Sequence, residues 1–199
     1  MTRHVQVMAA AMLLTYALGC AARSRTAEIP LGHWKGQGLF VLDRWGDDEE
    51  NAAEHVVEYG SYDTSLTLEE ATFEGRPAVR MEIVSLRGET KELDGDRTHL
   101  VVVLQKEESV LADTVALYRM AQFGLSFDED EPSLDDVPDN ARLASGMQIG
   151  KELLLRIHYQ DNFVDLFQFT GDVVHKHGTF GGPQAEGIVH WSETLRRQR

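Results

Sequence analysis

The chain is built from short segments in which apolar and polar residues alternate, with Gly, Asp and Asn between them. In the last segment Val189, Trp191 and Leu195 share one face, whereas His190 and Ser192 lie on the other. A period of two residues is typical of a β-strand with one buried face. The pattern predicts about ten strands. They lie at residues 33–42, 54–59, 63–73, 78–86, 98–106, 113–122, 148–159, 163–170, 173–180 and 187–195.

Turn-forming residues join many of these segments directly. Glu74-Gly75 and Gly171-Asp172 are pairs that accept positive φ and reverse the chain within a few residues. Consecutive strands then pair antiparallel, and no room is left for the long crossover helices of a parallel sheet. The sequence therefore predicts an all-β fold, an antiparallel up-and-down β-barrel with at most one or two short helices in the domain.

Two alternatives to this architecture stay open at the level of the sequence. An open β-sandwich shows the same alternation of faces, and periodicity alone does not separate it from a barrel. Within residues 110–120, Leu111, Val115 and Tyr118 also fit a helical stripe, so a short helix competes with a strand there.

The first twenty residues form a segment of a different kind. A basic start at Arg3 is followed by an apolar run over 5–18, which is too short to span a bilayer and is typical of a secretory signal helix. Residues 17–20, Ala-Leu-Gly-Cys, resemble a bacterial lipobox. The resemblance implies a signal peptide over 1–19 and a lipidated Cys20. The small, polar and unpatterned residues that follow predict a flexible tether over 20–30, and the alternating pattern predicts one barrel domain over 31–199. The alternative is an ordinary signal peptide followed by an incidental cysteine.

Composition limits the partners and the means of attachment. The chain has one cysteine, so an intrachain disulfide is excluded and the domain must depend on its apolar core. A formal net charge of −14 argues against nucleic acid or anionic lipid as an electrostatic partner. Membrane attachment would come from the lipid on Cys20. The predicted location is the bacterial cell envelope, at the outer membrane or periplasmic face rather than in the cytoplasm.

The first predicted strand carries the pattern Gly32-x-Trp34-x-Gly36-x-Gly38. This pattern resembles the first strand of the lipocalin and calycin group, and its longer form is similar to that of nitrobindin-like barrels. The resemblance implies that Trp34 closes one end of a barrel and that a late basic residue, Arg196 or Arg197, packs over it. Gly36 and Gly38 leave one strand face bare, which permits a sharp bend or the close approach of another backbone.

A barrel of this kind leaves interior space for one small molecule. The leading hypothesis is therefore a lipid-anchored envelope protein that carries an apolar or amphipathic ligand, such as a fatty acid. Six residues are predicted to line the cavity: Tyr59, Tyr62, Met81, Tyr118, Phe167 and Trp191. The alternative is a structural or protein-interaction lipoprotein with a filled barrel, whose protein partner the sequence leaves unknown.

Metal or haem binding is a further hypothesis. His175 and His177 are two residues apart on a strand, so their imidazoles share a face and could share a metal. A third ligand is required, and no spacing ties one to the pair; the candidates are His158, His190, Asp165 and Asp172. The competing interpretation is a pair of solvent-facing histidines. A haem-ligating histidine is implied only by the nitrobindin-like resemblance, and no cofactor is predicted.

Two remaining features bear on function. The acidic residues of the segment 128–139 are predicted to form a solvated loop, because the segment lacks the glycine that a calcium-binding EF-hand loop requires. The chain has no Gly-x-Ser-x-Gly, His-Glu-x-x-His, Cys-x-x-Cys or phosphate-binding motif. The sequence thus favours a binding role over catalysis, although distant side chains could still compose an active site.

Overall fold

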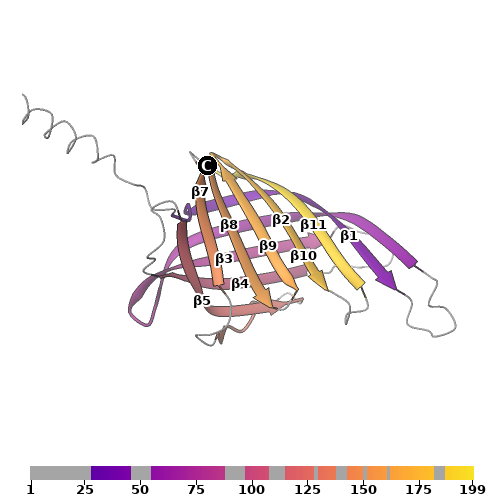
Figure 1. Ribbon diagram of the computed structural model, residues 1–199. Coiled ribbons are helices and arrows are strands. Elements are labelled where there is room, and N and C mark those ends of the chain that lie inside the picture. The colour runs from indigo at the N-terminus through magenta and orange to yellow at the C-terminus, as the bar shows by residue number, and fades with distance from the viewer. Residues whose placement is uncertain are drawn as a thin grey trace, which may run out of the picture.

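The protein is a closed antiparallel β-barrel of ten strands (Figure 1). The computed structural model describes residues 28–45, 55–87, 97–107, 115–127, 130–137, 143–149, 152–160, 162–181 and 187–199. Neighbouring strands follow one another in chain order, and the last strand pairs with the first to close the ring. The structure therefore confirms the predicted up-and-down barrel of lipocalin- or calycin-like type, and the open β-sandwich is wrong.

The ring is formed by ten long strands, and an eleventh, short strand pairs with the outer edge of one of them. The strands are β1 (Gly32–Trp45), β2 (His55–Phe73), β3 (Arg76–Arg87), β4 (Arg97–Lys106), β5 (Val115–Ser126), the short β6 (Asp135–Asp136), β7 (Leu143–Ile149), β8 (Glu152–Gln160), β9 (Phe163–Thr170), β10 (Val173–Gly181) and β11 (Gly187–Arg197). The ring closes where β11 meets β1, and β5 continues it to β7.

The division of the chain into strands differs from the sequence prediction in β2 and in β7 and β8. Predicted strands 54–59 and 63–73 form the single long strand β2, because Gly60 and Ser61 continue the ladder with β1. Predicted strand 148–159 is the end of β7 and all but the last residue of β8. Residues 115–120 belong to β5, so the helical alternative is wrong for that part of the segment. Within the described ranges no helix has the length and apolar character of a membrane span.

A two-residue turn joins β2 to β3, as the sequence predicts. Glu74 has φ 48° and Gly75 has φ 75°, both in the left-handed region. Two consecutive residues with positive φ give the type I′ geometry, whose twist matches that of the flanking strands. The turn fixes the register in which Phe73 faces Arg76. It thereby fixes which side chains of β2 and β3 enter the barrel.

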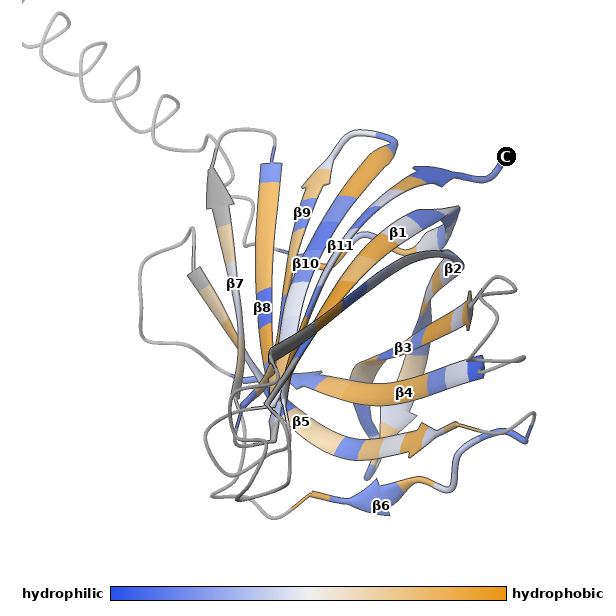
Figure 2. Cartoon of the chain, turned by 90° about the vertical axis from the view of Figure 1, so that its right-hand side faces the viewer, coloured by the Kyte–Doolittle hydropathy of each residue, from blue (hydrophilic) through white to orange (hydrophobic). Residues whose placement is uncertain are grey.

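The barrel interior is packed with apolar side chains at the end that contains Trp34. Trp34 is fully buried, and Leu66, Met81 and Leu195 from three other strands lie in the same core. Each strand contributes alternate residues to this core, as β9 shows with buried positions at every second residue. Figure 2 shows the same alternation as bands of hydrophobic and hydrophilic colour along the strands. The first and last strands meet at this end, where Trp34 pairs with Arg197.

The described part of the acidic segment packs against the outside of the barrel. Glu131 forms an ion pair with Arg80 of β3 at 2.7 Å. Leu134 packs against a small outer cluster that contains Val103 and Ala121, and β6 pairs with β5 (Figure 2). The described acidic side chains in residues 130–137 are all exposed, as predicted. The segment is nevertheless attached to the barrel wall, because Leu134 and the β6 pairing hold it against β5.

The predicted signal peptide over 1–19 and the lipidation site Cys20 lie outside the described residues. Ile29, which belongs to the predicted tether, is 6% exposed and packs in the main core. The folded domain therefore begins at least two residues before Leu31, where the alternating pattern starts.

Candidate functional site

A cavity of about 170 Å³ lies inside the barrel, away from the Trp34 end. Most of its wall is apolar and aromatic: Phe40, Leu125, Phe127, Phe163, Phe180, Val189 and Trp191. Its polar lining is Tyr62, Ser85, Thr98 and Glu193. Phe127 and Phe180 are 67% and 52% exposed, so these two rings form the solvent side of the cavity. The barrel is thus filled at one end and hollow at the other.

A buried carboxylate forms the polar wall of the cavity. Glu193 is 2% exposed, and its Oε1 accepts hydrogen bonds from the Tyr62 hydroxyl and from Lys176 Nζ, each at 2.8 Å. Its Oε2 accepts a longer hydrogen bond of 3.4 Å from the Thr64 hydroxyl. Hydrogen bonds to a buried carboxylate compensate for the hydration that it loses on folding.

A second buried carboxylate lies beside the first. Asp165 is 1% exposed; Trp191 Nε1 donates to its Oδ1 at 2.8 Å, and the Tyr159 hydroxyl donates to its Oδ2 at 3.0 Å. Lys176 Nζ lies 3.7 Å from Asp165 Oδ2. One ammonium therefore serves two carboxylates in the interior. We call Asp165, Lys176 and Glu193 the buried triad.

The strand register explains why the triad assembles. Lys176 on β10 pairs with Glu193 on β11, and Glu193 pairs with Gly38 on β1. Gly38 pairs in turn with Tyr62 on β2, so the four residues form one row across the barrel wall. Cross-strand neighbours on one face lie within side-chain reach, which brings the charged groups together.

Gly38 allows Tyr62 to reach across β1. A methyl group on Gly38 would lie 2.4 Å from Tyr62 Cζ and 2.7 Å from its hydroxyl oxygen. The tyrosine ring therefore covers the glycine, and its hydroxyl meets Glu193 on the far side. Gly36 has a different role, because a methyl group there would meet the Thr194 carbonyl oxygen of β11. Both glycines thus allow another group to approach the backbone of β1 closely, as predicted: a tyrosine ring at Gly38 and the β11 backbone at Gly36.

Gly178 repeats this arrangement on the other side of the triad. A methyl group on Gly178 would lie 2.2 Å from Trp191 Nε1 and 2.3 Å from Asp165 Oδ1. Trp191 comes from β11 and Asp165 from β9, and Gly178 lies between them on β10. An aromatic donor thus crosses a glycine twice in this barrel, each time to reach a buried acid.

Burial shifts the protonation of the triad. Burial, reinforced by the negative charge of Glu193, raises the pKa of Asp165 to about 6, although Lys176 and the two hydrogen bonds oppose the shift. Burial alone would lower the pKa of Lys176, but the two carboxylates outweigh it and the pKa lies above its ordinary value. Burial next to Asp165 also raises the pKa of the Tyr159 phenol well above its ordinary value. Lys176 is therefore cationic and Tyr159 neutral at pH 7.

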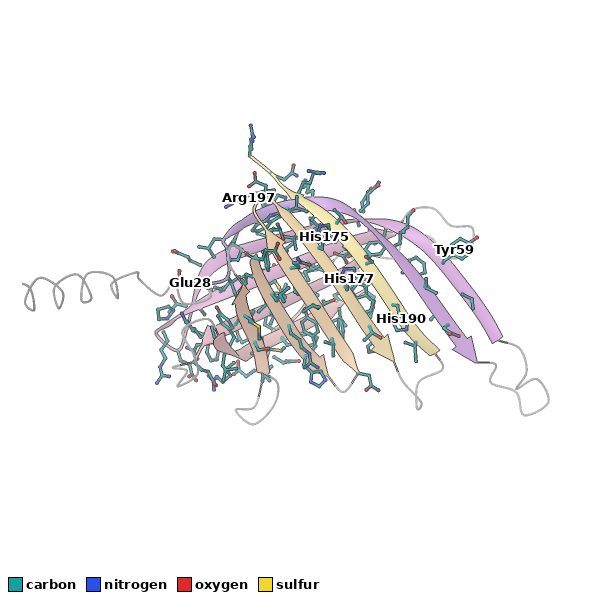
Figure 3. All side chains as sticks on the ribbon, turned by 45° about the horizontal axis from the view of Figure 1, so that its top comes forward. Glu28, Tyr59, His175, His177, His190 and Arg197 are labelled. Carbon is teal, nitrogen blue, oxygen red and sulfur yellow. The ribbon has the colours of Figure 1, made fainter. Side chains whose placement is uncertain are left out.

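Two of the six side chains predicted to line a cavity do so. Tyr62 and Trp191 contribute to the wall and also donate hydrogen bonds to the two buried acids. Tyr59 is 81% exposed and projects from β2, away from the interior (Figure 3). Residue parity explains this difference, because Tyr59 is an odd number of positions from Tyr62 on the same strand.

The other three predicted lining residues belong to the packed core. Met81 and Phe167 are fully buried, and Tyr118 is 3% exposed. Tyr118 lies near Ile29, and burial raises the pKa of its phenol to about 12. These side chains fill the barrel and do not face its cavity. They are core residues, which is the usual role of large apolar side chains on a buried strand face.

His175 and His177 lie on the outer face of β10, opposite to Lys176 (Figure 3). His175 Nδ1 is 3.2 Å from the Thr194 hydroxyl. Among the described residues no group of three or more His, Cys, Asp or Glu side chains is placed to hold a metal ion. Asp165, one candidate for the third ligand, points into the barrel instead. The described chain therefore does not assemble the metal site that the histidine spacing suggested.

The basic residue over Trp34 is Arg197. Its Cζ lies 5.4 Å from the Trp34 ring centroid, and its Nη2 donates to the Leu31 carbonyl at 2.6 Å. Arg196 is exposed on the outer face, because inward positions of β11 alternate through Glu193 and Leu195 to residue 197. Of the two arginines that the resemblance suggested, Arg197 packs over Trp34, because it lies on the inward face of β11 with Glu193 and Leu195.

Sequence reasoning missed the triad as a unit, although the signals are present. In β9 the inward face reads Phe163, Asp165, Phe167 and Phe169, so an acid stands within an aromatic stripe. In β11 Glu193 occupies the same face as Trp191 and Leu195. A charged residue on an otherwise apolar strand face indicates a buried partner of opposite charge.

The chain matches no protein-family model, and no curated protein matches its sequence. The cavity and the triad are therefore the features of this chain that bear on its function.

Proposed function

We propose that the barrel binds one small apolar or amphipathic molecule in the cavity beside Glu193. Ligand sites in proteins are concave and mostly apolar, with a few polar groups that fix orientation. This cavity has that composition, with aromatic walls and a buried carboxylate. The single observation that carries the proposal is the position of Glu193, which is part of the triad and also lines the cavity.

The alternative of a filled structural barrel fits the interior less well. In the described part of the chain the apolar core packs the barrel from the Trp34 end and leaves a cavity beside Phe163 and Trp191. Burying Asp165, Lys176 and Glu193 also costs desolvation energy that apolar residues of similar volume would avoid. Perturbed charges beside a cavity are more typical of a functional site than of a purely structural core.

The ligand is tested by native and denaturing mass spectrometry of the purified full chain. We expect a reproducible added mass that disappears on denaturation. Val189→Phe extends a lining side chain into the cavity and should reduce the bound fraction. Val57→Phe is the matched control, because Val57 is 51% exposed. A bare chain mass in every preparation, together with no binding of added small molecules, would contradict the proposal.

We further propose that the barrel is held at a bacterial membrane by a lipid on Cys20. The lipobox-like residues 17–20 support this proposal, and two or more acyl chains hold a protein on a membrane where one does so only marginally. Intact-mass measurement after expression in a bacterium should show a chain that begins at Cys20 and carries a diacylglyceryl group. Cys20→Ser should lose both the lipid mass and the membrane fraction. A processed chain with an unmodified Cys20 would contradict the proposal.

A further inference from the structure

We propose that the cavity selects a protonated amine attached to a small aromatic or apolar body, and that it rejects carboxylates such as fatty acids. This inference rests on the proposed ligand-binding function and specifies its chemical class. It follows from which atoms of the cavity wall remain able to interact with a ligand.

The polar wall presents an acceptor. Glu193 lines the cavity as a carboxylate, which accepts hydrogen bonds and donates none. Its Oε1 already accepts from Tyr62 and Lys176, whereas the protein donor to Oε2 is the distant Thr64 hydroxyl at 3.4 Å. A ligand donor at Oε2 would complete the hydrogen bonding of this buried carboxylate.

Three donors that line the cavity already serve protein acceptors, and the lining hydroxyl of Thr98 can both donate and accept. Tyr62 gives its single hydroxyl hydrogen to Glu193, and Trp191 gives its indole hydrogen to Asp165. Ser85 donates to the Thr64 hydroxyl at 3.2 Å, and Thr64 donates onward to Glu193. An incoming carboxylate would thus meet the Glu193 carboxylate, with the Thr98 hydroxyl as a donor among the described lining residues, whereas an ammonium would meet a carboxylate of opposite charge.

Lys176 does not offer its charge to a ligand anion. Its ammonium lies 2.8 Å from Glu193 and 3.7 Å from Asp165, and it is not part of the cavity lining. Two carboxylates against one ammonium leave the interior with a surplus acidic group. A ligand cation would balance that surplus, and a ligand anion would add a like charge at short range.

The size and the aromatic walls of the cavity limit the size and the chemistry of the uncharged part of the ligand. A cavity of about 170 Å³ holds roughly one six-membered ring with a short arm, since a 150 Å³ apolar cavity is known to bind benzene. Phe40, Phe163 and Trp191 line the same cavity as the Glu193 carboxylate and present aromatic surfaces to it. Aromatic faces attract a cation through the ring quadrupole, which reinforces the selection of an amine.

Isothermal titration calorimetry of the full chain at pH 7 and low salt provides the test. The probes are 2-phenylethylamine, 2-phenylethanol and phenylacetate, which share a ring and differ in the charge of the head. We expect the amine to bind at least about tenfold more tightly than the alcohol, and phenylacetate to bind most weakly. Equal affinities, or tightest binding of phenylacetate, would overturn the amine inference and leave the proposed ligand-binding function standing. Absence of binding by all three would overturn the amine inference, and the mass-spectrometric experiment decides separately whether the cavity retains any ligand.

Two variants test whether Glu193 is the carboxylate that binds the amine. Glu193→Gln removes the charge at nearly constant shape, so we expect amine affinity to fall about tenfold while alcohol affinity stays within about twofold. Binding of the alcohol also shows that the variant is folded. Glu70→Gln is the matched control, because Glu70 is exposed on β2, and it should change neither affinity. Unchanged amine binding in folded Glu193→Gln would overturn the assignment; if that variant does not fold, the comparison of the three probes on the natural chain still decides.

Discussion

The ring of Tyr62 lies so close above Gly38 that a methyl group on the glycine would stand 2.4 Å from Cζ. This contact lets the Tyr62 hydroxyl reach Glu193 across the width of β1. The third glycine of the Gly-x-Trp-x-Gly-x-Gly pattern is thereby connected to the interior charge network. Glycine is required at this position for a steric reason, because one added carbon atom would displace the Tyr62 ring.

Gly38→Ala should therefore destabilise the barrel by about 1–3 kcal/mol, since overpacking forces the Tyr62 ring from its position. The free energy of unfolding is measured by denaturant titration. In a Tyr62→Ala background the same substitution should cost less than in the natural chain, because the ring that it displaces is absent. An equal cost in both backgrounds would show that the ring contact is not the cause.

Lys176→Met should lower the free energy of unfolding by about 3–5 kcal/mol, because it leaves Asp165 and Glu193 buried without a cation. Lys35→Met is the matched control: Lys35 is exposed on β1, so the change should stay within about 0.5 kcal/mol. Combining Lys176→Met with Glu193→Gln should cost less than the sum of the two single changes, because the residues interact directly. Strict additivity would contradict this coupling.

Stability should depend on pH through Asp165. The carboxyl titrates near 3.8 when unfolded and at about 6 when folded, so between these values the folded state binds more protons. Its contribution to the unfolding free energy therefore falls as pH rises through this window, by on the order of 3 kcal/mol. The groups that face it are Tyr159, Lys176 and Glu193.

The measurement compares the natural chain with Asp165→Asn at several pH values. Both proteins share all other titrating groups, so the difference between their unfolding free energies reports Asp165 together with its coupling to Lys176 and Glu193. We expect the natural chain to lose stability relative to the variant from about pH 4 to pH 6 and the difference to level off above that. A difference that is constant over this range would contradict the raised pKa.

Arg197→Ala should destabilise the barrel by about 1 kcal/mol, because the guanidinium over Trp34 contributes a cation–π contact and a hydrogen bond to Leu31. Arg196→Ala, at the exposed neighbouring position, should change stability by less than about 0.5 kcal/mol. Chemical denaturation of the two variants gives the comparison. Equal losses would remove Arg197 from any special role at this end of the barrel.

Alternation along single strands predicted an all-β fold and the inward face of β11, and the short turns favoured the antiparallel barrel without excluding the sandwich. It did not separate β7 from β8, because Ala144 and Gly146 carry too little side chain to show a pattern. The cavity-lining prediction chose aromatic residues by type, so it included exposed Tyr59 together with Tyr62. Parity within β2 would have separated these two, but the direction of each face becomes certain only when the ring is closed.

The buried triad depends on registers that single strands do not specify. Asp165, Lys176 and Glu193 come from three strands, and the pattern within one strand indicates a buried acid without showing which cation it meets. Their proximity requires β9, β10 and β11 to pair in one particular alignment. Long-range pairing of this kind is set by the whole fold.

The triad also bears on how the barrel reaches one structure rather than several similar ones. If β11 slipped by one residue against β10, Glu193 would turn to solvent and Ser192 or Thr194 would face Lys176. A lysine would then be left inside without its closest carboxylate, at a cost of several kcal/mol. The same slip between strands without buried charges would cost less free energy. The buried charges thus add an electrostatic penalty to this misaligned register in the closed barrel, beyond the cost of exposing apolar side chains.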